Sequence, residues 1–132
     1  MAKRLLDTSV LVSYWHHRAP DRLETVDTQQ ARGWADDLIR SLGSDLIVTP
    51  VYVEFLAGVR TSHEMRLAAA YLAPFRVLDG GSIPSRDWEE AKRLAARVPR
   101  DGKPRQLGDC LIRAIADRLN CEVLAIDKPF RS

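Results

Sequence analysis

Short apolar runs alternate with longer amphipathic segments along the whole chain. The short runs are typical of β-strands and lie at residues 4–6, 46–48, 75–78 and 121–126. In the longer segments, apolar residues recur every three or four positions, which predicts helices at residues 8–15, 29–42, 50–60, 62–72, 85–98 and 107–120. Strands that alternate with helices form parallel sheets flanked by helices. The pattern therefore predicts an α/β fold with a short parallel sheet of about four strands.

Residues that favour caps and turns mark the ends of several elements. Thr49 is predicted to cap the helix that follows it, with Pro50 at the first helical position. Ser85 is predicted to cap the helix at residues 85–98, and Gly43 to end the helix at residues 29–42. Residues 16–28 are polar and contain a proline, which predicts a loop.

Length and composition indicate an ordinary globular protein. The 132 residues are expected to form a single domain, residues 1–132, because no linker, repeat or low-complexity tract divides them. A net charge of +2 is too small to indicate a nucleic-acid partner by itself. No stretch approaches the ~18 apolar residues of a membrane span, and Asp7 interrupts the apolar segment that a signal peptide would need. Cys110 and Cys121 lack metal-site spacing and are expected to be buried free thiols. We therefore expect a cytoplasmic protein with no membrane association.

Acidic residues stand where strands end and helices begin. Asp7 and Asp127 directly follow strands, Asp109 opens the last helix, and Glu54 lies one turn inside the helix after the second strand. Ligands of open parallel sheets gather at the carboxyl ends of the strands, so these acids are candidates for one site. Carboxylates that converge repel one another unless a cation compensates, and Mg²⁺ or Mn²⁺ prefers oxygen ligands.

Each acid also has an alternative that involves no site. Asp7 is suited to cap the first helix, Glu54 to be a solvated helix residue, and Asp127 to lie in a turn. Asp109, in the first turn of a helix, is expected to stay ionised because the helix dipole favours a negative charge there. Residue spacing alone leaves these alternatives open.

Four segments resemble the signature segments of PIN-domain nucleases, and their order most resembles the VapC-type toxins of toxin–antitoxin pairs. They are residues 5–11 (LLDTSVL), 53–58 (VEFLAG), 108–114 (GDCLIRA) and 126–130 (IDKPF). The resemblance covers essentially the whole chain and implies a three-layer α/β/α domain. It implies metal binding by Asp7, Asp109 and Asp127, and a role for Glu54 directly or through water. It also implies that the hydroxyl of Ser9 hydrogen-bonds a ligand carboxylate.

The same resemblance implies function and partners. A metal-dependent endoribonuclease with Mg²⁺ or Mn²⁺ is expected, acting as the toxin of a type II toxin–antitoxin system by cleaving RNA. Its partners would be the RNA substrate, a cognate antitoxin protein and a second copy in a homodimer. Arg100, Lys103 and Arg105 precede the acid of the last helix and would hold RNA phosphates, unless they form only a solvated loop.

Other features are less specific. Trp34 and Trp88 lie on apolar helix faces and are predicted to pack in the core, whereas Trp15 is suited to either a core or an interface. Residues 50–72 carry more apolar side chains than one small sheet face needs, which indicates either a groove for a partner helix or ordinary core burial. The histidines are expected at the surface.

Three other classes of protein are compatible with part of the sequence. The segment at residues 127–130 is similar to one in response-regulator receivers, but no acid pair follows the first strand. A haloacid-dehalogenase phosphatase needs a second acid two residues after its nucleophile, where Ser9 stands after Asp7. A PIN-like module that binds RNA or a partner without catalysis has no use for intact carboxylates.

Overall fold

The computed structural model describes residues 3–97 and 106–126. Within these ranges the strands are β1 (Lys3–Leu6), β2 (Leu46–Ile47), β3 (Arg76–Val77) and β4 (Cys121–Leu124). The helices are α1 (Thr8–Arg18), α2 (Thr28–Leu42), α3 (Thr49–Ala57), α4 (Ser62–Leu72), α5 (Ser85–Ala95) and α6 (Leu107–Arg118). A short 3₁₀ turn, η1, spans Leu23–Thr25. None of the helices in the described ranges is long and apolar enough to cross a bilayer.

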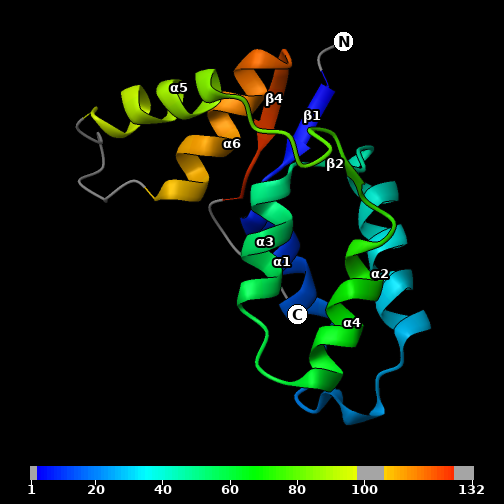
Figure 1. The fold of residues 1–132 in the computed structure, drawn as a ribbon. Coiled ribbons are helices and arrows are strands. Elements are labelled where there is room, and N and C mark those ends of the chain that lie inside the picture. The colour runs from blue at the N-terminus through cyan, green and yellow to red at the C-terminus, as the bar shows by residue number, and fades with distance from the viewer. Residues whose placement is uncertain (1–2, 98–105, 127–132) are drawn as a thin grey trace.

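All four described strands run parallel in the order β3-β2-β1-β4. Figure 1 shows α2 and α4 together on one side of the sheet and α5 and α6 together on the other. This is a three-layer α/β/α fold, and it confirms the fold predicted from the alternating pattern. The chain moves outward from β1 to β2 and β3, and then returns to place β4 on the other side of β1. The strand order therefore reverses at β1, which is where open parallel sheets bind their ligands.

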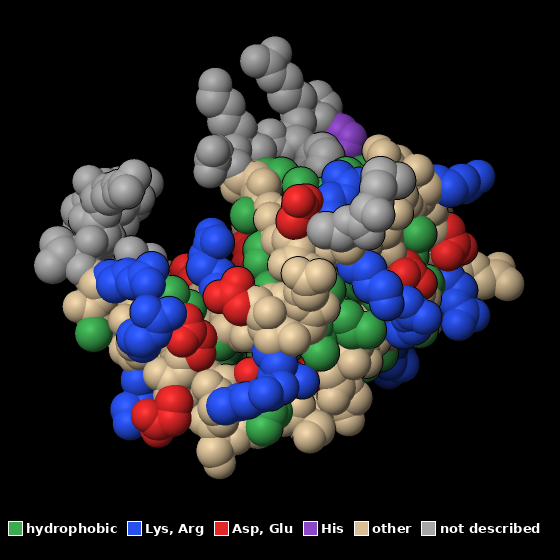
Figure 2. Space-filling view, turned by 90° about the horizontal axis from the view of Figure 1, so that it is seen from above, with side chains coloured by type: hydrophobic (Ala, Val, Ile, Leu, Met, Phe, Trp, Pro, Cys, Tyr) green, Lys and Arg blue, Asp and Glu red, His purple; other side chains and the backbone are tan. Residues whose placement is uncertain are grey.

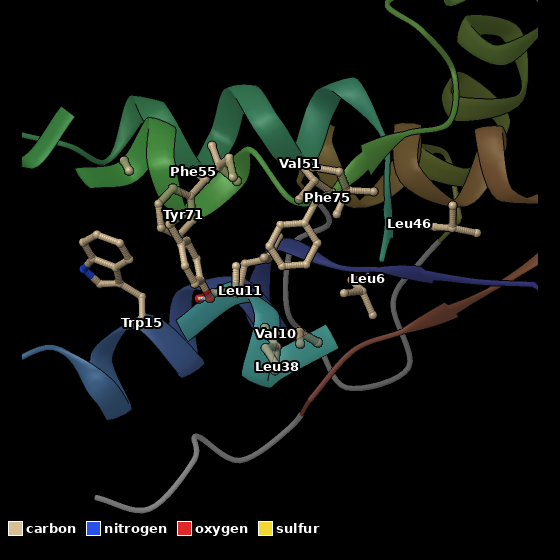
Figure 3. Close-up of a cluster of buried hydrophobic side chains, with 14 of the residues drawn as sticks. Leu6, Val10, Leu11, Trp15, Leu38, Leu46, Val51, Phe55, Tyr71 and Phe75 are labelled. Carbon is tan, nitrogen blue, oxygen red and sulfur yellow. Dashed lines mark hydrogen bonds between the residues drawn. The ribbon is translucent and has the colours of Figure 1, made fainter. Parts of the chain in front are cut away.

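Aromatic side chains from several helices fill the core beneath the sheet. Trp15 packs edge-on against Trp34, Phe55 and Tyr71, with ring centroids 5.0–5.6 Å apart. Tyr71 is fully buried, and its hydroxyl donates a 2.9 Å hydrogen bond to the carbonyl of Leu11, as Figure 3 shows. Burial raises the pKa of the Tyr71 phenol, so the hydroxyl keeps its proton. Trp15 thus belongs to the core rather than to an interface.

The pair of helices α5 and α6 has a small core of its own. Its buried side chains come from both helices: Ala91, Leu94, Cys110, Leu111 and Ala114. Asp87 is only 1% exposed, and both of its carboxylate oxygens accept hydrogen bonds from Nε of Arg118, at 2.9 and 3.0 Å. This buried ion pair fixes the start of α5 to the end of α6.

The prediction for Trp88 was wrong, because 44% of this residue is exposed. One helical residue corresponds to a rotation of about 100°, so a helix that buries Asp87 turns its neighbour Trp88 toward solvent. The surplus of apolar residues at 50–72 is mostly explained by the protein's own core. Val51, Phe55 and Tyr71 are all buried, whereas Val53 is 57% exposed.

Several predicted boundaries also need correction. Residues 16–18 were expected in a loop but extend α1, where basic side chains at the end of a helix interact well with its dipole. Val48, not Thr49, caps α3, because the N–H and hydroxyl of Thr49 both donate to one oxygen of Asp79, at 3.0 Å. Pro84, not Ser85, precedes the first turn of α5. Of the two thiols, both free, Cys110 is buried but Cys121 only half-buried.

An open cleft of about 480 Å³ lies at the amino ends of the strands. Charged residues of both signs line it: Lys3, Arg4, Asp45, Arg76 and Glu122. Figure 2 views the molecule from the end at which β1 begins, and there the basic and acidic side chains are interspersed. This end of the sheet is therefore not a uniformly basic surface, and the acids considered next lie at the opposite end.

Candidate active site

Asp7 is fixed by backbone contacts at the point where β1 becomes α1. It is the N-cap of α1, and its Oδ2 accepts a 3.1 Å hydrogen bond from the N–H of Ser9. The N–H of Asp7 donates to the carbonyl of Leu124 at the end of β4, at 2.9 Å. Asp7 is thus a helix cap, as one alternative held, and it also stands at the switch point of the sheet. The two descriptions are compatible.

Ser9 contacts this region through two different groups. Its backbone N–H donates the hydrogen bond that holds the carboxylate of Asp7. Its hydroxyl accepts a 3.4 Å hydrogen bond from the N–H of Ile126. Ser9 therefore ties the segment that leaves β4 to the first turn of α1.

Glu54 reaches from α3 to the starts of both α1 and α6. Its Oε1 accepts a 2.6 Å hydrogen bond from the hydroxyl of Thr8. On the other side, the carboxylate lies against Gly108, where an ideal Cβ would stand only 2.3 Å from Oε2. Glu54 is half-buried, and these contacts show that it is not simply a solvated helix residue.

Asp109 follows Gly108 in the first turn of α6. Partial burial raises the pKa of its carboxyl above the ordinary value, and the negative charge of Asp7 raises it further. Arg113 and a backbone hydrogen bond at Gln106 lower this pKa without cancelling the rise. Burial and the charge of Asp7 therefore outweigh the groups that favour the ionised form, so Asp109 takes up a proton more readily than an ordinary aspartate does. The shift also shows that Asp7 and Asp109 lie near enough to interact.

The structure brings these acids together from separate elements. Asp7 comes from the junction of β1 and α1, Glu54 from α3 and Asp109 from α6, and they gather at the carboxyl end of β1. Asp127 lies outside the described residues, as do the predicted phosphate-binding residues Arg100, Lys103 and Arg105.

The described acids fit a hard divalent cation. The charge of Asp7 raises the pKa of Asp109, so a positive charge between the two carboxylates would relieve their repulsion, and their oxygen donors suit Mg²⁺ or Mn²⁺. Within the described ranges, no group of three or more acidic, histidine or cysteine side chains is arranged to hold a metal. Mg²⁺ is commonly held by one or two carboxylates and several waters. Asp7 and Asp109 can supply such a pair, with Glu54 beside it.

Two residues of this cluster escaped the sequence interpretation. Thr8 stands between Asp7 and Ser9, and only the folded structure shows that its hydroxyl binds Glu54. Gly108 carried a signal, because glycine disfavours a helix and usually has a packing reason when it stands inside one.

Fold and acid cluster together define a class: parallel α/β/α domains with a carboxylate site at the switch point of the sheet. The family model of the PIN domain matches residues 4–132, and the chain belongs to the PIN domain family. PIN domains are generally nucleases. Comparison with curated proteins gave no match.

Proposed function

We propose that this protein is an Mg²⁺- or Mn²⁺-dependent endoribonuclease and the toxin of a type II toxin–antitoxin pair. One observation carries the enzymatic part of the proposal. Asp7 and Asp109 come from elements far apart in the sequence, yet they lie near enough for one charge to raise the pKa of the other. A structure tolerates such repulsion at a functional site more often than elsewhere. In a PIN domain, this arrangement supports metal-assisted hydrolysis of RNA.

In the proposed mechanism, Asp7 and Asp109 would hold the metal ion, with Asp127 as a further ligand. The chemistry that Mg²⁺ or Mn²⁺ would supply there is to lower the pKa of a water and to neutralise charge on the scissile phosphate. The N–H of Ser9 keeps the carboxylate of Asp7 oriented, and Thr8 keeps Glu54 beside the pair. Attack of water on phosphorus with departure of the 3′-oxygen leaves 5′-phosphate and 3′-hydroxyl ends.

Cleavage by the purified protein, freed of any antitoxin, tests this proposal. The wild-type protein should cut RNA with Mg²⁺ or Mn²⁺ and not with EDTA, and Asp7→Asn or Asp109→Asn should abolish cutting. Asp27→Asn is the matched control, since Asp27 caps α2 as Asp7 caps α1 but lies at another helix. Calorimetric titration with Mn²⁺ should show binding that Asp7→Asn weakens and Asp27→Asn leaves unchanged. A wild-type protein that cuts no RNA with either metal contradicts the proposal.

The substrate is proposed to be held by Arg100, Lys103 and Arg105. These cations precede α6 in the sequence, and α6 carries Asp109 in its first turn. Each phosphate contact that is lost should reduce the salt dependence of RNA binding by about one counterion. Replacing all three by alanine should therefore weaken binding and flatten its dependence on salt, while the Mn²⁺ affinity stays unchanged.

The toxin role implies a growth phenotype and partners. Induced expression in the cytoplasm should arrest growth, and Asp109→Asn should not. A cognate antitoxin, encoded by a short neighbouring reading frame, should relieve the arrest when it is co-expressed. We also propose a homodimer, which sedimentation measures directly. Arrest that persists in the Asp109→Asn variant would instead favour a binding module that acts without catalysis.

A further inference from the structure

The side chain of Glu54 is held from two sides by residues of two other elements. The hydroxyl of Thr8, at the first position of α1, donates to Oε1 over 2.6 Å. This length is typical of a hydroxyl that donates to a carboxylate, which is stronger than a bond between neutral groups. Glu54 is thereby fixed to the helix that Asp7 caps.

The opposite side of the same carboxylate is closed by Gly108. An ideal Cβ at this position would lie 2.3 Å from Oε2, 2.5 Å from Cδ and 2.6 Å from Oε1. No side chain fits there while Glu54 keeps its place. Gly108 has no positive φ and stands in the first turn of α6, so backbone conformation does not require glycine at this position. A side chain at this position would instead displace the Glu54 carboxylate, which is the far end of a flexible side chain, from its hydrogen bond with Thr8.

We propose that Thr8 and Gly108 form a cradle that positions the carboxylate of Glu54 beside Asp7 and Asp109 for the reaction. This inference rests on the proposed nuclease function. A free glutamate side chain has several rotamers. The hydrogen bond from Thr8 selects one of them, and the missing side chain of Gly108 leaves room for the carboxylate in that position. Both residues act through Glu54, so they are positioning residues.

The hydroxyl of Thr8 is tested by a change that keeps the shape of the side chain. Thr8→Val should lower kcat about 10- to 100-fold, the range typical of lost partners of catalytic carboxylates, with KM for RNA unchanged. Thr8→Ser should restore most of the activity, because it returns the donor. Thr28→Val is the matched control, since Thr28 follows the capping aspartate of α2 as Thr8 follows that of α1. It should cut RNA like the wild type.

A double-mutant cycle shows whether Thr8 acts through Glu54. In a Glu54→Gln background, adding Thr8→Val should cause little further loss of kcat, because the partner that Thr8 orients is already changed. Independent, multiplicative losses would overturn the proposal. So would full activity of Thr8→Val, or a Thr8→Ser variant as impaired as Thr8→Val.

The role of Gly108 is tested through stability, which needs no nuclease activity. Gly108→Ala should raise the melting temperature less than Gly33→Ala does, because the added methyl group displaces Glu54 from Thr8, and this deficit should disappear in a Glu54→Ala background, where the methyl group has room. Gly33→Ala is the matched control. Gly33 lies inside α2 with no atom within 4 Å of an added Cβ, so this change should leave the melting temperature unchanged or raise it.

The two readouts separate this proposal from the proposed function. A wild-type protein that cuts no RNA refutes the nuclease, and the cradle is then decided by the coupling between Gly108 and Glu54 in stability. Equal effects of Gly108→Ala with and without Glu54 would overturn the cradle even in an active nuclease.

Discussion

Arg118 is the group that allows the carboxylate of Asp87 to lie in the interior between α5 and α6. Asp87 is 1% exposed, and Nε of Arg118 lies 2.9 and 3.0 Å from its two oxygens. Arg118→Met keeps much of the apolar stem of the arginine and removes the guanidinium. The buried carboxylate then has neither its ion-pair partner nor water around it. An uncompensated buried charge of this kind strongly destabilises the folded state.

The expected loss is large on the scale of the whole domain. Removing one partner of a buried ion pair costs about 3–5 kcal/mol, whereas domains unfold with about 5–15 kcal/mol. With a urea dependence of about 1–3 kcal/mol per molar, the unfolding midpoint should fall by roughly 2 M. Replacing both partners, as in Asp87→Leu with Arg118→Met, should recover most of the loss, because the buried charge is then gone.

Urea unfolding followed by tryptophan fluorescence and circular dichroism measures this effect. Arg93→Met is the matched control, because Arg93 on α5 pairs with Glu90 on an exposed helix face, where an ion pair contributes little. Its midpoint should stay close to that of the wild type. The reasoning about burial is refuted if Arg118→Met lowers the midpoint no further than Arg93→Met does.

Other variants test the site and the core. Asp109→Asn should stabilise the metal-free protein at neutral pH. The pKa of Asp109 in the folded state lies above its ordinary value of 3.8, so the folded protein binds the proton more tightly than the unfolded chain does. The ionised carboxyl therefore destabilises the fold increasingly as pH rises from about 4. In thermal melts the gain should fade toward pH 3, and a gain independent of pH would contradict this sign. Asp7→Asn should lower the pKa of Asp109 in an NMR titration, since it removes a neighbouring negative charge; an unchanged pKa would show that the two carboxyls do not interact. Mn²⁺ at a hundred times its Kd should stabilise the wild type by about 2.7 kcal/mol, and EDTA should reverse this, whereas Asp109→Asn should respond much less. Tyr71→Phe removes the hydrogen bond that the phenol donates to the carbonyl of Leu11 and should cost about 0.5–1.5 kcal/mol in urea unfolding, with RNA cleavage unchanged.

Local patterns were enough to predict the order and type of the main elements. Apolar runs placed each strand within a few residues, and Gly43, in the left-handed conformation with φ 71°, ends α2 where it was expected. Interactions between distant residues decided the rest. Asp79, some thirty residues later in the chain, accepts hydrogen bonds from both the N–H and the hydroxyl of Thr49 at the start of α3. Thr49 therefore does not act as the N-cap that its sequence position predicted. Trp88 is exposed because Asp87 pairs with Arg118.

For the candidate site too, local patterns predicted some residues, and contacts between distant residues decided the others. Asp7 and Asp109 could be nominated because each follows a recognisable boundary of a strand or helix, and the structure places them within electrostatic reach. The contacts of Glu54 with Thr8 and Gly108 could not be predicted, because they depend on how closely three helices approach one another. Arg113, which lowers the pKa of Asp109, was missed for the same reason.

The pairing of β1 with β4 has a consequence for the time at which the site is completed. Lys3 pairs with Cys121 and Leu6 with Leu124, so β1 cannot complete its pairing until β4 has been synthesised. During synthesis from the N-terminus, β1 keeps an open edge, and Asp7 lacks the carbonyl that fixes its N–H, until Leu124 has emerged. The proposed nuclease site would therefore stay unassembled while the nascent chain is still on the ribosome, close to the RNA that encodes it. Stalled chains that end before Cys121 should leave nearby RNA uncut, and cleavage by such chains would show that the site forms without β4.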